Sequence, residues 1–171
     1  MVYTIKYETI RKIGNVEIRR YPKIIIAKVE DSEADAFNIL YRFITGENKQ
    51  QAKVKMTAPV FSQQIAMTSP VFSDTEALAF VMPAEFNLET TPEPSDKRVK
   101  IAEIPARLVA AVRFSGGWSE SRFEKEKQEL LKELAEAGIK TRGTVFSMLY
   151  NPPFIPGFLR RNEVAVEVEG N

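Results

Sequence analysis

The feature of this sequence that most limits its fold is an internal repeat at an offset of 83 residues. Residues 16–30 read VEIRRYPKIIIAKVE and residues 99–115 read VKIAEIPARLVAAVRFS, and the two segments run in step when Pro22 is set over Pro105. Each segment is typical of a strand, a proline-marked break and a second, β-branched strand. The repeat therefore predicts two similar halves, each opening with two strands.

A helix is predicted after each of these segments. The first helix has apolar residues at spacings of three and four, which places them on one face: Phe37, Leu40, Tyr41 and Ile44. Ser32 is its candidate N-cap and Gly46 its candidate stop. In the second half, Ser121 and Glu124 are spaced as a capping box, and Gly138 is the expected stop.

Further strands are predicted after both helices. They are expected at 53–56, 65–67 and 78–82 in the first half, and at 145–150 and 163–168 in the second. Each half then has the order strand, strand, helix, strand, strand, and neither half buries its apolar face alone. We therefore expect an α+β fold, a distorted antiparallel β-barrel with two packed helices. We expect one domain over residues 1–171, with halves of about 1–86 and 97–171 joined by a proline-rich crossover.

The composition excludes several classes of function. The sequence has no cysteine and no histidine, so disulfides, thiolate nucleophiles, cysteine-ligated metals and histidine-dependent triads are ruled out. A net charge of +1 gives no general attraction to nucleic acid or to an anionic membrane. No apolar run approaches the roughly 18 residues of a spanning helix, and the start does not resemble a secretory signal. We expect a cytoplasmic protein without nucleic-acid or membrane partners.

Two apolar stretches invite more than one interpretation. MTAPVF at residues 56–61 recurs as MTSPVF at 67–72, and its prolines restrict it to sheet edges, bulges or turns. Met56 and Met67 are then strand-end packing residues, or they form a soft rim suited to a flat ligand. The segment 151–158, NPPFIPGF, carries three prolines and three large apolar side chains. It either caps the core or walls a ligand pocket.

A dense polar group, Arg160-Arg161-Asn162-Glu163, precedes the last predicted strand. One interpretation is anion recognition. The other is that the two arginines pair with carboxylates and tie the neighbouring loop to the sheet. No pair of carboxylates is spaced as an acid–base couple, so no catalytic residue is predicted.

Several motifs together resemble the SOUL family of haem-binding proteins, in its microbial branch. They are KMTAPV (55–60), FVMPAEF (80–86), FSGGWS (114–119) and YNPPFIPGFLRRNEV (150–164), and the resemblance runs from about Tyr7 to Val168. It implies a distorted barrel of two similar halves, like the effector-binding domains of gyrase-inhibitor-like and multidrug-sensing proteins. It also implies a tetrapyrrole in an apolar cleft between the first helix and the loop before the last strand.

Carried onto this sequence, the resemblance and the apolar patterns above give nine expected ligand contacts. They are Phe37, Leu40, Tyr41, Ile44, Met56, Met67, Phe154, Ile155 and Phe158. Arg42 or Lys53 would meet the propionates. The chain departs from the family in lacking a histidine at the first helix, so iron ligation falls to Tyr41, Met56 or Met67, or does not occur.

Three functions remain open at this point. The first is a hydrophobic ligand-binding protein that stores, transports or buffers haem or another tetrapyrrole, with no other cofactor and no protein-held metal. The second is a small-molecule effector-binding sensor that acts through a protein partner, which rests on fold analogy alone. The third is a hydrolase or isomerase that uses Glu, Asp or Tyr. We expect the first, and we expect no enzymatic activity.

Overall fold

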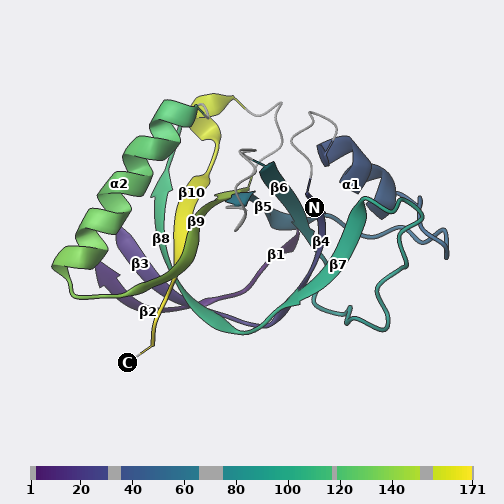
Figure 1. Cartoon of the computed structure of the whole chain (residues 1–171), viewed down its shortest axis with the longest axis horizontal. Coiled ribbons are helices and arrows are strands. Elements are labelled where there is room, and N and C mark those ends of the chain that lie inside the picture. Colours follow the sequence, from purple (N-terminus) through teal and green to yellow (C-terminus); the bar gives the residue numbers. More distant parts are fainter. Residues whose placement is uncertain (1–2, 31–35, 66–74, 117–118, 151–155, 171) are drawn as a thin grey trace, which may run out of the picture. The chain divides into compact units, whose positions relative to one another are not determined.

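The structure, a computed structural model, describes all residues except 1–2, 31–35, 66–74, 117–118, 151–155 and 171 (Figure 1). The chain divides into two compact units. Unit 1 contains Met1–Ile5 and Lys23–Pro105, and unit 2 contains Lys6–Pro22 and Ala106–Asn171. These units differ from the two halves of the repeat, because unit 1 includes one strand of the second half and unit 2 includes two strands of the first half. The expectation of one domain over 1–171 stays a prediction.

Unit 1 is a mainly antiparallel sheet covered on one face by a helix. Its strand order is β5-β6-β4-β7, with β1 added in parallel beside β5. The elements are β1 (Tyr3–Thr4), β4 (Ile24–Glu30), α1 (Ala36–Ile44), β5 (Thr57–Ile65), β6 (Thr75–Val81) and β7 (Val99–Ile104). Alternate strand residues such as Ala27, Val29 and Phe80 pack against the buried face of α1, which positions the helix on the sheet.

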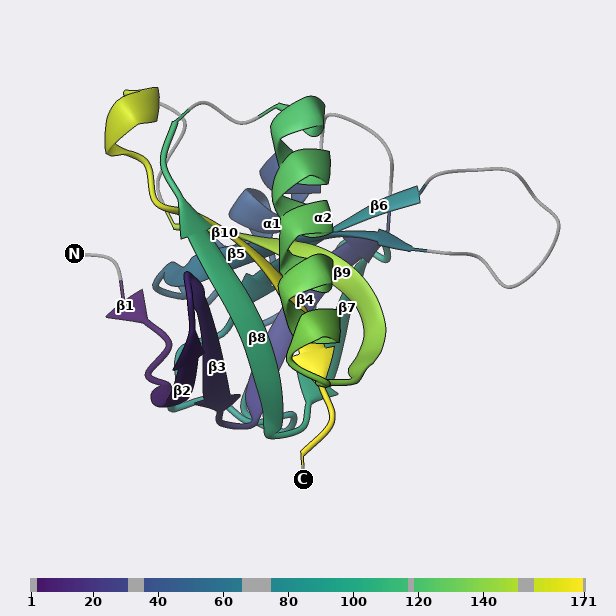
Figure 2. The same cartoon turned by 90° about the vertical axis from the view of Figure 1, so that its left-hand side faces the viewer.

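Unit 2 repeats this plan with a longer helix. Its antiparallel strand order is β2-β3-β8-β10-β9, and α2 lies across β8 and β10 (Figure 2). The elements are β2 (Glu8–Ile13), β3 (Val16–Tyr21), β8 (Arg107–Phe114), α2 (Glu120–Glu136), β9 (Thr141–Leu149), the 3-10 helix η1 (Gly157–Leu159) and β10 (Asn162–Val168). Leu130 and Leu134 of α2 are buried against Val16, Ala110 and Val164 of the sheet.

The two repeated segments exchange partners. β3 of the first segment pairs with β8 of the second, and β4 pairs with β7. Val16 faces Val112 and Tyr21 faces Arg107 in one ladder, and Ile24 faces Ile104 in the other. The register of the two paired segments continues without a shift across the breaks at Pro22 and Pro105. The proline-marked breaks are therefore the places where each segment passes from one unit to the other.

The α+β class, the antiparallel strands, the two helices and the strand–strand–helix–strand–strand order of each half are confirmed. The sheets are not closed, because β7 in unit 1 and β2 in unit 2 each have one strand neighbour among the described strands. The barrel expected from the sequence is therefore an open sheet in each unit.

Some local expectations were wrong. Residues 53–56 form no strand, and β5 begins at Thr57. The N-cap of α2 is Ser119, whose hydroxyl accepts a hydrogen bond from the Arg122 amide at 3.1 Å, so the expected capping box at Ser121 does not form. The cap falls two residues earlier because Ser119 is extended and its oxygen reaches the third amide of the helix.

Other local expectations are confirmed. Gly138 follows the end of α2 with a positive φ of 71°, a conformation that glycine adopts without steric cost. Pro59 lies within the register irregularity of β5 between Thr57 and Phe61, as its missing amide proton requires. The candidate cap Ser32 and the second proline, Pro70, lie outside the described residues.

Candidate functional site

Helix α1 carries the expected ligand contacts on two different sides. Leu40 is 0% exposed and Ile44 is also buried, and both pack into the core of unit 1 beside Ile39 and Phe43. Phe37 and Tyr41 lie on the exposed side of the helix. Only the latter two therefore present ring surface to the exterior, and Leu40 and Ile44 serve to anchor the helix under them.

Phe37 and Tyr41 form a stacked aromatic pair, which we call the aromatic shelf. They are one helical turn apart, with ring centroids 6.2 Å apart and ring planes only 11° from parallel. Phe37 is 37% exposed and Tyr41 is 49% exposed. The ring of Phe37 also meets the buried ring of Phe80 edge-on at 5.3 Å, which fixes its orientation. The shelf is therefore a partly exposed stack of two rings, in which the core fixes the orientation of Phe37.

The other expected ligand contacts in unit 1 differ in how far their side chains are exposed. Met56 is partly buried and packs against the core of the unit. Arg42 and Lys53, the expected propionate contacts, are both exposed, and the Arg42 guanidinium lies 3.5 Å from the Glu47 carboxylate. An exposed ion pair of this kind contributes little stability, so the guanidinium can be redirected to a ligand carboxylate at low cost.

A residue that the sequence analysis missed holds the end of α1. Asn48 is buried, and its amide nitrogen donates hydrogen bonds to the carbonyls of Phe43 at 3.0 Å and Ala52 at 2.8 Å. Its side-chain oxygen accepts a hydrogen bond from the Ala52 amide at 2.9 Å. Asn48 thereby satisfies backbone groups that the end of the helix leaves unpaired. The sequence signal that could have identified this residue is an asparagine two positions after Gly46, close to the end of the predicted helix.

The expected contacts in the C-terminal loop belong to unit 2. Phe158 lies in η1 and is 76% exposed, and its neighbour Leu159 is also exposed. Phe154, Ile155 and the second methionine, Met67, lie outside the described residues. The aromatic shelf belongs to unit 1, so the joint cleft expected between the helix and this loop stays a prediction.

Unit 2 contains a buried ionic cluster built around Glu163. This residue is 0% exposed and accepts hydrogen bonds from Arg19 Nη2 at 2.9 Å, from Arg161 Nη2 at 2.7 Å and from the Tyr150 hydroxyl at 3.2 Å. Arg19 also donates to Glu17 at 2.8 Å. Arg161 therefore pairs with a carboxylate, and the expected tie of the neighbouring loop to the sheet stays a prediction.

The charges of this cluster are internally balanced. Burial alone would raise the pKa of Glu163, but hydrogen bonds and positive charge from Arg19 and Arg161 hold that pKa below its usual value. Burial raises the pKa of Tyr150 and of Tyr21, whose hydroxyl accepts a hydrogen bond from Arg19. An ionised carboxylate bound by two guanidiniums is a poor general base, so the cluster serves to hold β3 and β10 together.

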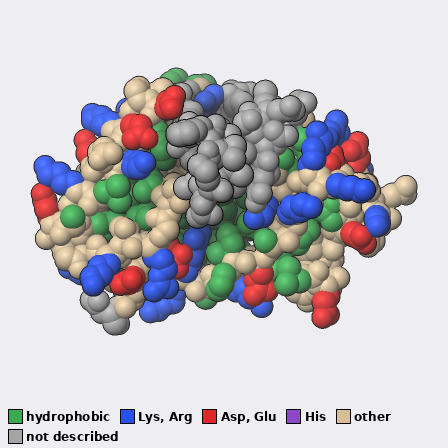
Figure 3. Space-filling view, viewed as in Figure 1, with side chains coloured by type: hydrophobic (Ala, Val, Ile, Leu, Met, Phe, Trp, Pro, Cys, Tyr) green, Lys and Arg blue, Asp and Glu red, His purple; other side chains and the backbone are tan. Residues whose placement is uncertain are grey.

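The described residues give no indication of a metal site, and one face of the molecule shows mixed charges. Figure 3 shows Lys and Arg interspersed with Asp and Glu on the face that it displays. Within the described ranges, no group of three His, Cys, Asp or Glu side chains is arranged to hold a metal ion. None of the helices in that part of the chain is both long and apolar enough to cross a membrane.

The fold is similar to that of several proteins of known structure. The chain matches the C-terminal domain of EcmrR with a TM-score of 0.64 and 12% identity, covering 96% of this chain and 99% of that domain. It also matches a hydrolase from Listeria innocua with a TM-score of 0.58 and 11% identity, covering 93% and 94% of the two chains. At such low identity these likenesses show a shared fold alone.

Sequence comparison identifies the family to which the chain belongs. The family model described as SOUL heme-binding protein matches residues 2–167, and the chain belongs to this family. Heme-binding protein 2 of Homo sapiens is 31% identical over 164 residues, covering 88% of this chain and 77% of the human protein. Heme-binding protein 2 of Mus musculus is 32% identical over 141 residues, covering 78% and 66%. The resemblance drawn from the motifs is thereby confirmed.

Proposed function

We propose that this protein binds a flat hydrophobic ligand, a haem or another tetrapyrrole, on the aromatic shelf of α1, and stores, transports or buffers it. The observation that carries the proposal is the near-parallel, half-exposed pair of Phe37 and Tyr41 rings. A planar macrocycle can extend such a stack, and each ring contact contributes about 1 kcal/mol beyond simple area burial. Membership of the heme-binding family supports the same ligand class.

The residues present fit a tetrapyrrole through contact better than through iron. The sequence contains no histidine, and Met56 is packed against the core. Among the expected iron ligands that the structure describes, Tyr41 alone has a largely exposed side chain. When bound, haem would supply an iron centre for redox or ligand chemistry. The chain's own contribution is stacking by Phe37 and Tyr41 and charge from Arg42 and Lys53 toward the propionates.

The test is a pair of titrations with haemin, followed by its Soret band, and with metal-free protoporphyrin, followed by fluorescence. We expect saturable one-to-one binding of both compounds with similar affinity. Phe37→Ala and Tyr41→Ala should each weaken both by roughly tenfold, the equivalent of about 1.4 kcal/mol. Leu88→Ala is the matched control, because Leu88 is an exposed apolar residue of unit 1 outside α1.

Two further outcomes separate the alternatives. Tyr41→Phe keeps the ring and removes the phenol hydroxyl, so loss of the Soret shift in this variant, with protoporphyrin binding retained, would mean that the tyrosine ligates iron. If neither compound binds saturably at micromolar protein, or if the shelf variants bind as the Leu88→Ala control does, the proposal fails. An effector-binding role through a protein partner would then be the better hypothesis, as the similarity to the EcmrR domain suggests.

A further inference from the structure

Strand β2 forms an open edge of the sheet in unit 2 (Figure 2). It has one strand neighbour among the described strands, β3, and its side chains at residues 8–12 are all exposed. The register with β3 shifts between Thr9 and Arg11, which leaves Ile10 as the extra residue of a bulge. The side chain of Ile10 is 44% exposed. The edge therefore carries an outward apolar residue at its centre.

A further strand is a poor partner for this edge. A bulge and charged side chains are the features by which sheet edges avoid pairing with another strand, and β2 has both. What β2 offers to a partner is therefore its side chains.

The side chains around this edge are mainly basic. Residues 6–22, the first segment of unit 2, contain five Lys and Arg and two Glu. The other residues of the chain contain 19 Lys and Arg and 21 Asp and Glu. The net charge of +1 therefore averages over a local excess of positive charge, and the weak attraction to anionic surfaces expected from it does not describe this edge.

Two of the five cations are neutralised within the unit. Arg19 is buried against Glu163, and Arg20 Nη1 lies 3.1 Å from Glu8 Oε2. The other three are exposed, and no ion pair of theirs is found among the described residues: Lys6, Arg11 and Lys12. We call these three and Ile10 the basic edge.

The apolar centre of the basic edge favours a lipid surface over a nucleic acid. Contacts with anionic membranes combine cations with an apolar side chain that enters the headgroup boundary, and Ile10 is followed directly by Arg11 and Lys12. Single-stranded nucleic acid stacks its bases on exposed rings. The ring nearest in sequence, Tyr7, is partly buried and lies 4.3 Å from the Arg19 guanidinium carbon.

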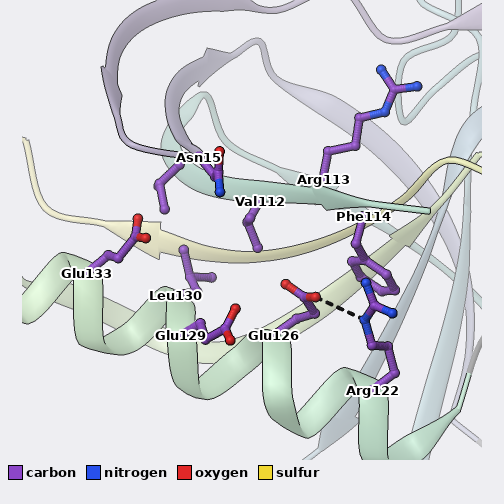
Figure 4. Close-up of a pocket in the computed structure, with 10 residues that line it drawn as sticks. Asn15, Val112, Arg113, Phe114, Arg122, Glu126, Glu129, Leu130 and Glu133 are labelled. Atoms are coloured by element: carbon purple, nitrogen blue, oxygen red, sulfur yellow. Dashed lines mark hydrogen bonds and ion pairs between the residues drawn. The ribbon is translucent and has the colours of Figure 1, made fainter. Parts of the chain in front are cut away.

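Helix α2 carries acidic side chains that an anionic surface would repel. Figure 4 shows Glu129 and Glu133 on α2, lining a hollow of about 220 Å³ together with Asn15. The helix lies over β8 and β10, and β8 is two strands from β2, about 10 Å at the usual strand spacing. Repulsion over that distance is largely screened at about 0.1 M salt. Glu133 is the exception because it lies beside Gly14 in the β2–β3 turn, so the contact is centred on Ile10 and not on the turn.

We propose that the basic edge docks on an anionic lipid surface. Its three cations would meet the headgroup phosphates, and Ile10 would enter the apolar boundary beneath them. This surface is formed by unit 2 alone and does not include the aromatic shelf, so the failure of one proposal leaves the other standing.

The test is co-sedimentation of the ligand-free protein with vesicles of phosphatidylcholine alone or mixed with phosphatidylglycerol, at low salt. We expect binding to the anionic vesicles only, and we expect it to weaken as salt is added. Arg11→Gln and Lys12→Gln should each weaken binding about fivefold. Ile10→Ser should weaken it without changing its dependence on salt. Lys125→Gln, which alters an exposed lysine of α2, is the matched control and should bind as the wild type does.

Two controls distinguish the basic edge from other surfaces. Phe37→Ala should bind vesicles as the wild type does, and loss of binding in this variant would mean that the aromatic shelf meets the lipid. A single-stranded RNA oligonucleotide should bind more weakly than the anionic vesicles. Tighter binding of the RNA that is lost in Arg11→Gln and Lys12→Gln would assign the edge to nucleic acid. Either result, absence of binding to anionic vesicles, or equal losses in Lys12→Gln and Lys125→Gln would overturn the proposal.

Discussion

Replacing Glu163 by glutamine should be among the most destabilising conservative changes in unit 2. The carboxylate accepts five hydrogen bonds, two from Arg19, two from Arg161 and one from Tyr150. Glutamine keeps one oxygen and turns an NH₂ group toward guanidinium donors, and both arginines lose their shared counter-charge. Removing one partner of a buried ion pair costs about 3–5 kcal/mol. With a urea m-value of about 2 kcal/mol per molar, the midpoint should fall by roughly 2 M.

The assay is urea unfolding followed by circular dichroism at pH 7, with Glu8→Gln as the control. Glu8 pairs with Arg20 at 3.1 Å on the surface, and both side chains are exposed, so its loss should cost less than about 0.5 kcal/mol. The triple variant Arg19→Met, Arg161→Met, Glu163→Met should recover much of the loss, because it removes the Glu163 carboxylate together with both of its arginines and leaves only the partly exposed Glu17 without its partner. A Glu163→Gln midpoint within 0.3 M of the control, as an order of magnitude for exposed pairs, would refute the reasoning.

The same change predicts a dependence on pH with a definite sign. The pKa of Glu163 is held below its usual value of 4.5 by the arginines. A group with a depressed pKa contributes stability that is present above its unfolded pKa and is lost as the pH falls through its folded pKa. The gap between wild type and Glu163→Gln should therefore stay constant from pH 7 to about 5 and narrow below 4.5. A gap that narrowed near neutral pH would contradict this assignment.

Three smaller predictions follow from other contacts. Asn48→Ala should cost about 2–3 kcal/mol in a urea titration, because it removes one buried and two partly buried hydrogen bonds at the end of α1. Ser119→Ala should lower the free energy of unfolding by about 1 kcal/mol and Ser121→Ala by measurably less, because Ser119 caps α2. Equal losses in the two variants would contradict the assignment of Ser119 as the N-cap. Burial raises the pKa of Tyr21 and Tyr150, so their contribution to the stability of the fold is present below pH 10 and is lost above it. In an absorbance titration at 295 nm, these two tyrosines should ionise only when the protein unfolds.

The order of the elements could be predicted because its signals are local. Alternating β-branched residues, the two prolines at an offset of 83 and the glycine after α2 each act over a few positions. The exchange of β3 and β7 between the halves could not be predicted from the same signals. A β-branched strand is satisfied by any suitable neighbour, so the sequence pattern does not choose between a partner in its own half and one in the other.

The sequence predicted the position of the candidate site but not which of its side chains are exposed. The spacing of Phe37, Leu40, Tyr41 and Ile44 located the helix face, but that stripe is wide enough to include both the core and its margin. Which two rings stay exposed depends on how the sheet lies beneath α1. The partner of Arg19 could not be predicted for another reason, because Glu163 is 144 residues further along the chain. Long-range pairs of this kind leave no local trace.

The exchange of strands between the repeated segments also governs the order in which the protein can be made. Unit 1 lacks its edge strand until β7 (Val99–Ile104) has left the ribosome, although most of its other strands are synthesised well before that point. In unit 2, β3 is synthesised well before β8, the strand with which it pairs. Neither half can therefore mature during translation on its own, and slow, non-local strand pairing should dominate the folding kinetics. Two separately expressed fragments, cut within residues 83–98, should each remain incomplete and should assemble into the native protein only when mixed.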